Sequence, residues 1–137
     1  MNLGRALSAE ICHRLQTTPP VPDMIAADRI GLGATSDDCL PQIAVAASPV
    51  FGDPVRSIAM SQHAAFIVEI TVRATTPTKA EGLAAGVYFA LRDRTHTDHA
   101  RGDGLSYKAT VIKTECEAET GGAACVRCAL RVEVAVH

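Results

Sequence analysis

The most regular pattern of apolar and polar positions lies between residues 64 and 91, where a strand pattern runs into a helix pattern. Apolar side chains at every second position from Phe66 to Val72 alternate with the set Ile67, Glu69, Thr71 and Arg73. This period of two predicts a strand whose Phe66/Val72 face is buried. A second stripe, with three- and four-residue spacing, predicts a helix that packs on that face; it consists of Ala80, Leu83, Ala84, Val87 and Leu91.

The start of this helix has two possible caps. Pro77 suits the first helical turn, where its missing N–H would have no partner, and Thr76 before it is a good N-cap. The alternative is a capping box from Thr78 to Glu81.

The N-terminal part predicts a helix followed by irregular chain. Leu3, Leu7, Ile11 and Leu15 recur at four-residue spacing, which predicts an amphipathic helix over residues 2–16. Prolines at positions 19, 20 and 22 predict an extended connector. A short strand over Ile25–Ile30 and then a turn or loop from Gly31 onward are expected next.

Three further strands are predicted. Gln42–Ala47 alternates as a short strand, followed by a turn-rich crossing over Ser48–Met60. Asp93–Gly104 is polar without any apolar period and predicts a loop. Leu105–Glu117 and Cys125–Val136 alternate again and predict a hairpin that turns at Gly121 and Gly122. In the first hairpin strand, one face is expected to carry Tyr107, Ala109 and Val111, and the other Lys108, Thr110, Ile112 and Thr114.

A chain of 137 residues with this order of elements predicts one domain, residues 1–137. The expected class is α+β, with a mostly antiparallel four-stranded sheet and two helices packed on one face.

Charge and composition exclude several classes of function. With 13 basic and 15 acidic residues the formal charge is -2, too balanced to attract nucleic acid or an anionic membrane. No Trp, three Phe and two Tyr leave few rings for stacking on bases. Apolar runs such as Ile43–Ala47 are far shorter than the roughly 18 residues of a membrane span. The sequence predicts a cytoplasmic product without a membrane partner.

The five cysteines are an odd number in a chain long enough to fold without bridges, which favours reduced thiols. They are Cys12, Cys39, Cys116, Cys125 and Cys128. Cys125 and Cys128 form a C-x-x-C, the spacing of a redox pair or half a zinc site. Residues three apart in a strand point to opposite faces, so a core cysteine and a strand-end cysteine are favoured over a metal site.

The polar loop contains the other potential metal ligands. His96, Asp98, His99 and Asp103 are suitable ligand types, and a His-x-x-His pair can reach one ion. No fourth ligand follows at a known spacing, so a solvated loop is favoured and no cofactor is expected. The segment Arg101-Gly102-Asp103 has the sequence of an adhesion tripeptide, and we interpret this segment as a turn.

The sequence contains no recognisable catalytic motif. Cys12 and His13 are adjacent in a helix pattern, where side chains diverge, so they do not form a nucleophile–base pair. The charged residues Glu69, Arg73, Arg131 and Glu133 lie on the polar faces of the two best strands. They are candidates for pairing across the sheet or for contact with a neighbouring subunit; the alternative is a solvated face with weak pairs.

The order of these features resembles the tail terminator, or tail-completion, family of long-tailed bacteriophages and gene-transfer particles. The resemblance rests on four segments of hydrophobic pattern that together span most of the chain. They are the opening helix Leu3–Leu15, the segment Leu40–Val45, the strand Phe66–Ala74 leading into Ala80–Ala84, and the closing strand Leu130–Val134.

The resemblance implies a structural protein of the virion tail or neck, assembled in the host cytoplasm, and not an enzyme. It implies a hexameric ring that caps the tail tube, ends tube polymerisation and offers a surface to the head–tail connector. The expected partners are further copies of the chain, the tail tube protein and the connector, with DNA at most passing through the ring lumen. By this resemblance the loops Asp93–Gly104 and Gly52–Ser61, with His96, His99, Arg101 and Asp103, are candidate interface segments beside Glu69, Arg73, Arg131 and Glu133.

Three alternatives stay open. One is another head–tail connector or neck protein. The second, from another class, is a small α+β enzyme or metal- or ligand-binding domain, for which the His96/His99 loop is the candidate site. The third is a regulatory binding module that stays monomeric until it meets its partner.

Overall fold

A computed structural model describes residues 3–33, 40–50, 56–58, 61–91, 95–97, 105–118 and 123–136. Over these ranges the chain forms three α-helices, one 3-10 turn and seven strands. In chain order they are α1 (Leu3–Thr17), α2 (Val21–Met24), η1 (Ala27–Arg29), β1 (Ile30–Leu32), β2 (Gln42–Pro49), β3 (Arg56–Ile58), β4 (Ser61–Ala74), α3 (Pro77–Leu91), β5 (Thr95–Thr97), β6 (Leu105–Ala118) and β7 (Ala124–Val136).

All seven described strands belong to one sheet in the order β1-β2-β4-β7-β6-β5, and β3 pairs with β4 off this path. Neighbours are antiparallel except β1 and β2, which are parallel. The α+β class is therefore confirmed, and the four predicted strands are the adjacent long ones, β2, β4, β7 and β6. The sheet is mostly antiparallel, as predicted, but the prediction of four strands was wrong, because three short strands add to the long ones and β1 pairs in parallel. The prediction of two helices was also wrong, because α2 is a third helix.

The helix–strand unit at the centre of the sequence forms as predicted. Thr76 caps α3, since the Lys79 amide donates to Thr76 Oγ1 at 3.2 Å, and Pro77 is the first helical residue. The predicted apolar stripe of α3 is buried apart from Ala84, which is half-buried. On β4 the predicted face from Phe66 to Val72 is buried as well, so this unit forms the centre of the core.

The connector after α1 differs from its prediction. Helix α1 begins and ends one residue later than predicted. The short helix α2 lies where part of the extended connector was predicted. Pro22 is compatible with this helix because it lies in the first turn, where no backbone N–H is needed. The strand expected over Ile25–Ile30 is wrong. Residues 27–29 form a 3-10 turn, and the strand instead covers residues 30–32, where pairing with β2 supports it despite Gly31.

Strand pairing also orders short pieces of segments that were predicted to be loops. Strand β3 lies within the predicted turn-rich crossing and β5 within the predicted polar loop, each paired to a long strand. In β6 a register shift between Val111 and Lys113 places Thr114 opposite Cys128, on the helix-facing side. The prediction that Thr114 shares a face with Lys108 and Thr110 was wrong, because an inserted residue shifts the alternation by one.

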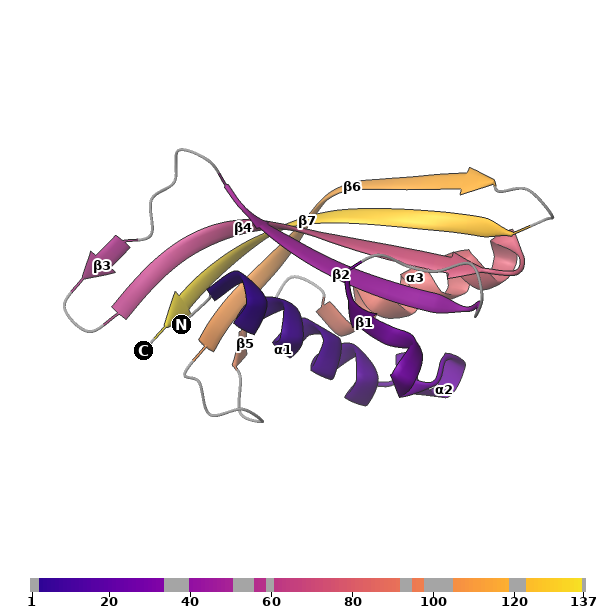
Figure 1. Cartoon of the computed structure of the whole chain (residues 1–137), viewed down its shortest axis with the longest axis horizontal. Helices are drawn as coiled ribbons and strands as arrows, with labels where there is room; N and C mark the ends of the chain where they lie inside the picture. The colour runs from indigo at the N-terminus through magenta and orange to yellow at the C-terminus, as the bar shows by residue number, and fades with distance from the viewer. Residues whose placement is uncertain are drawn as a thin grey trace.

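The described helices form a layer on one face of the long twisted sheet, and none of them lies on the other face (Figure 1). Helix α1 packs over β1 and β2, and α3 packs over β4 and β7. Between them α2 packs against Gly82 and Gly86 of α3; a Cβ on Gly86 would lie 3.4 Å from Val21 Cγ2. Among the helices described, none is long and apolar enough to span a membrane.

Candidate interaction surfaces

The face of the sheet opposite the described helices is the charged surface predicted from the sequence. Glu69 and Glu133 are exposed there, and Arg73 and Arg131 are half-buried. All four residues alternate with the helix-facing positions of β4 and β7, so the predicted placement on one polar face is confirmed.

The strand register shows how these four side chains are arranged. Glu69 lies between Ala46 of β2 and Ala129 of β7, so its directly opposite neighbours are uncharged. Glu133 lies directly opposite Lys108 of β6, and Arg131 Nε is 4.0 Å from Glu133 Oε1 on the same strand. Acidic and basic side chains are interspersed with uncharged ones on this face, which therefore has no strong field of one sign.

The same face continues onto β6 with two further exposed ion pairs. Lys113 Nζ lies 2.6 Å from Glu115 Oε1, and Arg127 Nη1 lies 3.3 Å from Glu117 Oε1. The hydrogen bond and charge of Lys113 lower the pKa of Glu115, and those of Glu115 raise the pKa of Lys113. Exposed pairs of this kind contribute little to stability, so this face is better suited to polar contact with another protein than to holding the fold together.

The predicted metal candidates do not come together in the described part of the chain. Cys125 lies opposite Glu117, and Cys128 lies opposite Thr114, so the two thiols of the C-x-x-C are on opposite faces as predicted. Both are buried, and burial raises the pKa of Cys128. Across the described ranges no group of three or more His, Cys, Asp or Glu side chains could hold a metal ion.

The other predicted loop residues lie mostly outside the described part of the chain. Only the backbone of His96 is described, in β5 opposite Tyr107. His99, Arg101 and Asp103, together with Asp98, lie outside the described residues, as do most of the segments 52–61 and 93–104.

An apolar groove lies between α3 and the turn end of the β6/β7 hairpin, where β6 ends and β7 begins. The sequence did not predict this groove. Its volume is about 420 Å³. One wall is a flank of α3 that includes Ala85 and Tyr88, and the floor and far wall come from β6 and β7, with Val111 and Cys116 among them. Tyr88 is 56% exposed and Val111 is 36% exposed, so the groove presents apolar surface that no described element covers.

The strand that forms the far wall also has an open edge. Strand β5 pairs with residues 106–108 of β6, and over the rest of β6 the described part of the chain contributes only β7 as a neighbour. An open strand edge presents unpaired N–H and C=O groups and is a template for a strand from another chain.

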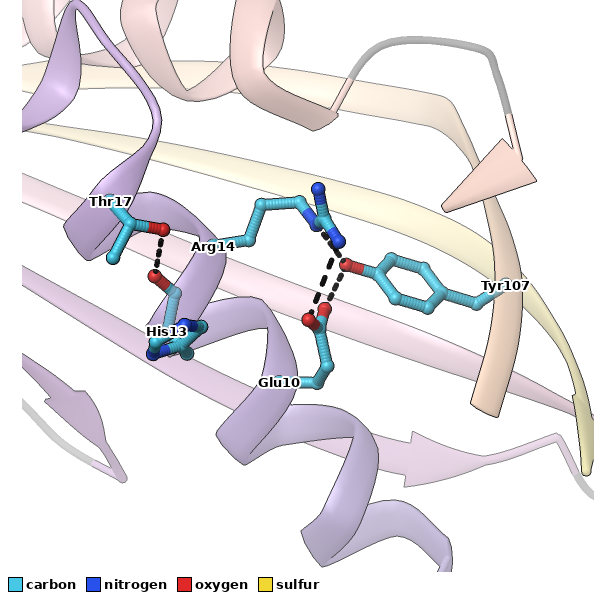
Figure 2. Close-up of polar contacts among 5 residues, drawn as sticks. All are labelled: Glu10, His13, Arg14, Thr17 and Tyr107. Atoms are coloured by element: carbon cyan, nitrogen blue, oxygen red, sulfur yellow. Dashed lines mark hydrogen bonds and ion pairs between the residues drawn. The ribbon is translucent and has the colours of Figure 1, made fainter. Parts of the chain in front are cut away.

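At the other end of β6 the same face is closed by a buried polar cluster of Glu10, Arg14 and Tyr107 (Figure 2). The Tyr107 hydroxyl donates a hydrogen bond to Glu10 Oε2. Arg14 Nε donates to the same hydroxyl at 2.8 Å, and Arg14 Nη2 lies 3.4 Å from Glu10 Oε1. Glu10 and Tyr107 are each 1% exposed.

This cluster joins the first helix to the edge region of the sheet. Burial of Tyr107, together with its hydrogen bond to Glu10, raises the pKa of the phenol, so Tyr107 stays a neutral donor. A buried carboxylate requires such partners, because an unpaired charge in the interior is costly. Glu10 follows Leu7 by three residues and precedes Arg14 by four, which places it beside the apolar stripe. That spacing is the only sequence signal of the cluster, since Tyr107 is distant in the chain.

Comparison with known proteins identifies a shared fold. No protein-family model matches the chain, and no curated protein matches it. A chain of the solved structure titled "Virion of native gene transfer agent (GTA) particle" aligns with a TM-score of 0.62 at 14% sequence identity. The alignment covers 98% of this chain and 99% of that chain. At this identity the similarity shows that the two chains have the same fold over their full lengths.

Proposed function

We propose that this protein is a structural component of a phage-like virion and, more specifically, a tail terminator. In this role it forms a hexameric ring at the neck, caps the last ring of the tail tube, stops tube polymerisation and presents the joining surface to the head connector. Its partners are copies of itself, the tail tube protein and the connector, and DNA contacts it at most by passing through the lumen.

The observation that carries this proposal is the full-length structural match to a chain of a gene transfer agent virion. Because both chains are covered almost completely, the similarity is between whole subunits and not between one shared motif. The order of elements in the sequence independently resembles the terminator family, and the two lines of argument point to the same kind of particle.

The surfaces of the chain suit such an assembly. A ring of identical subunits uses a heterologous contact, in which two different surfaces of each copy meet. The sheet has different strands at its two edges, β1 with β2 on one side and β6 with β5 on the other. The charged face, with acidic and basic side chains interspersed, is available for polar contact with axial neighbours. We propose no enzymatic role.

The decisive measurement is the native mass of the purified protein over a concentration series, combined with negative-stain images, with and without the tail tube protein. A six-fold ring that stays on tube ends and limits tube growth supports the proposal. So does a monomer that becomes ring-shaped only on tube ends. A monomer that does not bind tubes or change their growth overturns the proposal. A ring that leaves tube growth unchanged would favour the alternative of another neck protein.

A further inference from the structure

We infer that the groove between α3 and β6 is the docking site for the β1 edge of a second copy of this chain. The inference rests on the proposed function, because it assigns the two surfaces that meet between neighbouring subunits of the ring. In this contact Leu32 of one copy lies against Cys116 and Tyr88 of the next.

The first argument is the incomplete helix layer. Strands in a sheet are about 4.8 Å apart and packed helices about 10 Å apart, so one helix covers roughly two strands. Helix α1 covers β1 and β2, and α3 covers β4 and β7. The second half of β6 is the next position in this layer, and its helix-facing side chains Val111 and Cys116 line the groove uncovered.

The second argument is the opposite edge of the sheet, which presents a matching apolar side chain. Leu32 is two residues after the buried Ile30 and pairs with the buried Val45, so it points to the helix-facing side. It is nevertheless 50% exposed. An exposed leucine at one sheet edge and an exposed apolar groove at the other are complementary in a head-to-tail contact.

The third argument is the backbone of β1. The Gly33 amide donates to Val45 O at 3.1 Å, so Gly33 directs its backbone groups toward β2. Alternation along the strand then directs the N–H and C=O of Leu32 away from β2. Among the residues described, no strand occupies that side of β1, and Leu32 is positioned to pair with a neighbouring strand.

The directions of the strands favour this pairing. Strand β1 is parallel to β2, and three successive antiparallel steps lead from β2 to β6, so β6 runs opposite to β1. When the sheet of a second copy continues the first, its β1 meets β6 as an antiparallel neighbour, the more stable arrangement per residue. The α1 helix of that copy then continues the helix layer beside α3.

Cross-linking tests the contact directly, because Cys116 is a native exposed thiol in the groove. The variant Leu32→Cys, prepared in full-length protein with Cys39→Ser to remove an additional thiol, is assembled with or without tube protein. It is then treated with a short bismaleimide. We expect a ladder of covalent multimers on a denaturing gel that ends at the ring size.

Two controls keep the test specific. Adding Cys116→Ser should reduce the multimers at least tenfold. Adding Ile112→Cys to that variant places a thiol on the exposed residue at the β6 register shift, which does not line the groove, and should not restore them. Rings that show no cross-link between positions 32 and 116, or equal cross-linking at position 112, would overturn the inference.

A blocking variant provides a second readout. Ala85 is exposed and lines the groove, so Ala85→Arg fills the groove without opening the core. We expect an unchanged melting temperature and an assembled fraction at least tenfold lower, whereas Thr78→Arg, an exposed α3 position outside the groove, assembles normally. Normal assembly of Ala85→Arg would contradict the inference.

The groove contact and the proposed function can fail separately. Rings that cap tubes without the 32–116 cross-link retain the terminator role and exclude this interface. Cross-linked rings that do not affect tubes retain the interface and exclude the terminator role.

Discussion

The two halves of β6 differ in how their helix-facing side chains are covered. In the first half, Tyr107 is fully enclosed beneath α1 and bonded to Glu10 and Arg14, and β5 pairs along the edge. In the second half, Val111 and Cys116 face an open groove and the described structure supplies no strand along the outer edge.

With the interface proposed above, this difference separates folding from assembly within one strand. The buried first half contributes to the stability of the subunit, because removing buried atoms loses both transfer free energy and packing. The second half contributes less to the isolated subunit and is therefore free to be used in contact with another chain. An interface assembled from such surface does not compete with the core for the same side chains.

The largest expected effect comes from truncating matched positions in the two halves. Tyr107→Ala should lower the free energy of unfolding by about 3–5 kcal/mol, because it leaves a cavity and removes a donor from Glu10. Val111→Ala should cost less than about 1 kcal/mol, since the side chain is already partly solvated. Urea denaturation of both variants measures the difference.

Equal losses for Tyr107→Ala and Val111→Ala would break the comparison, because they would mean that the second half is also part of the folding core. The slope of the urea transition serves as a control, since an unchanged slope indicates that the native and unfolded states expose the same surface as before.

A smaller effect is expected from the hydrogen bond within the buried cluster. Tyr107→Phe keeps the ring but removes the hydroxyl that Glu10 and Arg14 share, and should cost about 1–3 kcal/mol. Glu10→Gln should cost a similar amount, because the amide is a weaker acceptor for Arg14. The double variant should cost less than the sum of the two, since the residues interact directly.

Additivity of Tyr107→Phe and Glu10→Gln within experimental error would show that the hydroxyl and the carboxylate are energetically independent. A third variant, Thr110→Ala, changes an exposed hydroxyl on the same strand. It should leave the stability unchanged.

Alkaline pH should reduce the advantage of Tyr107 over phenylalanine. Its pKa is raised in the folded chain above the ordinary value of 10.0, so the unfolded chain releases this proton at lower pH than the folded chain. The stabilisation is fully present below pH 10 and decreases by up to about 1.4 kcal/mol per pH unit above it. Denaturation of wild type and Tyr107→Phe from pH 8 to pH 11 should show the difference between them shrinking above pH 10.

The comparison with Tyr107→Phe is needed because a second buried group acts in the same direction. Burial raises the pKa of Cys12 from 9.0 to about 11, so it also lowers stability over part of this range. Both proteins contain Cys12, and its contribution cancels in their difference. A difference that stays constant up to pH 11 would contradict the assignment of Tyr107 as a neutral buried donor.

The parts of this fold that periodicity determines were predictable from the sequence. The face of β4 from Phe66 to Val72 and the Thr76 cap were predicted because strand alternation and helix capping are local properties. The polar face with Glu69 and Arg131 followed from the same alternation. Strand β1 was missed because its three residues contain Gly31 and depend on pairing with β2, a non-local contact.

The groove and the buried cluster were not predictable for the same reason. The groove depends on the residue inserted in β6 before Lys113, which turns Thr114 and Cys116 to the helix side, and no local pattern marks a register shift. The cluster joins Glu10 to Tyr107 across most of the chain, and a glutamate beside a helix stripe is ordinarily solvated.

The smallest expected effect lies on the exposed half of β6, at the ion pair between Lys113 and Glu115. Lys113→Ala should leave the urea midpoint within experimental error, because both side chains are solvated and water screens their attraction. The pKa of Glu115 should nevertheless rise toward its ordinary value when Lys113 is removed, since Lys113 is the main cause of its lowering. NMR titration of the glutamate side chains measures this change without any change in stability. A clear shift of the midpoint would mean that the charged surface of this half stabilises the subunit, and the division between a folding half and an assembly half of β6 would no longer hold.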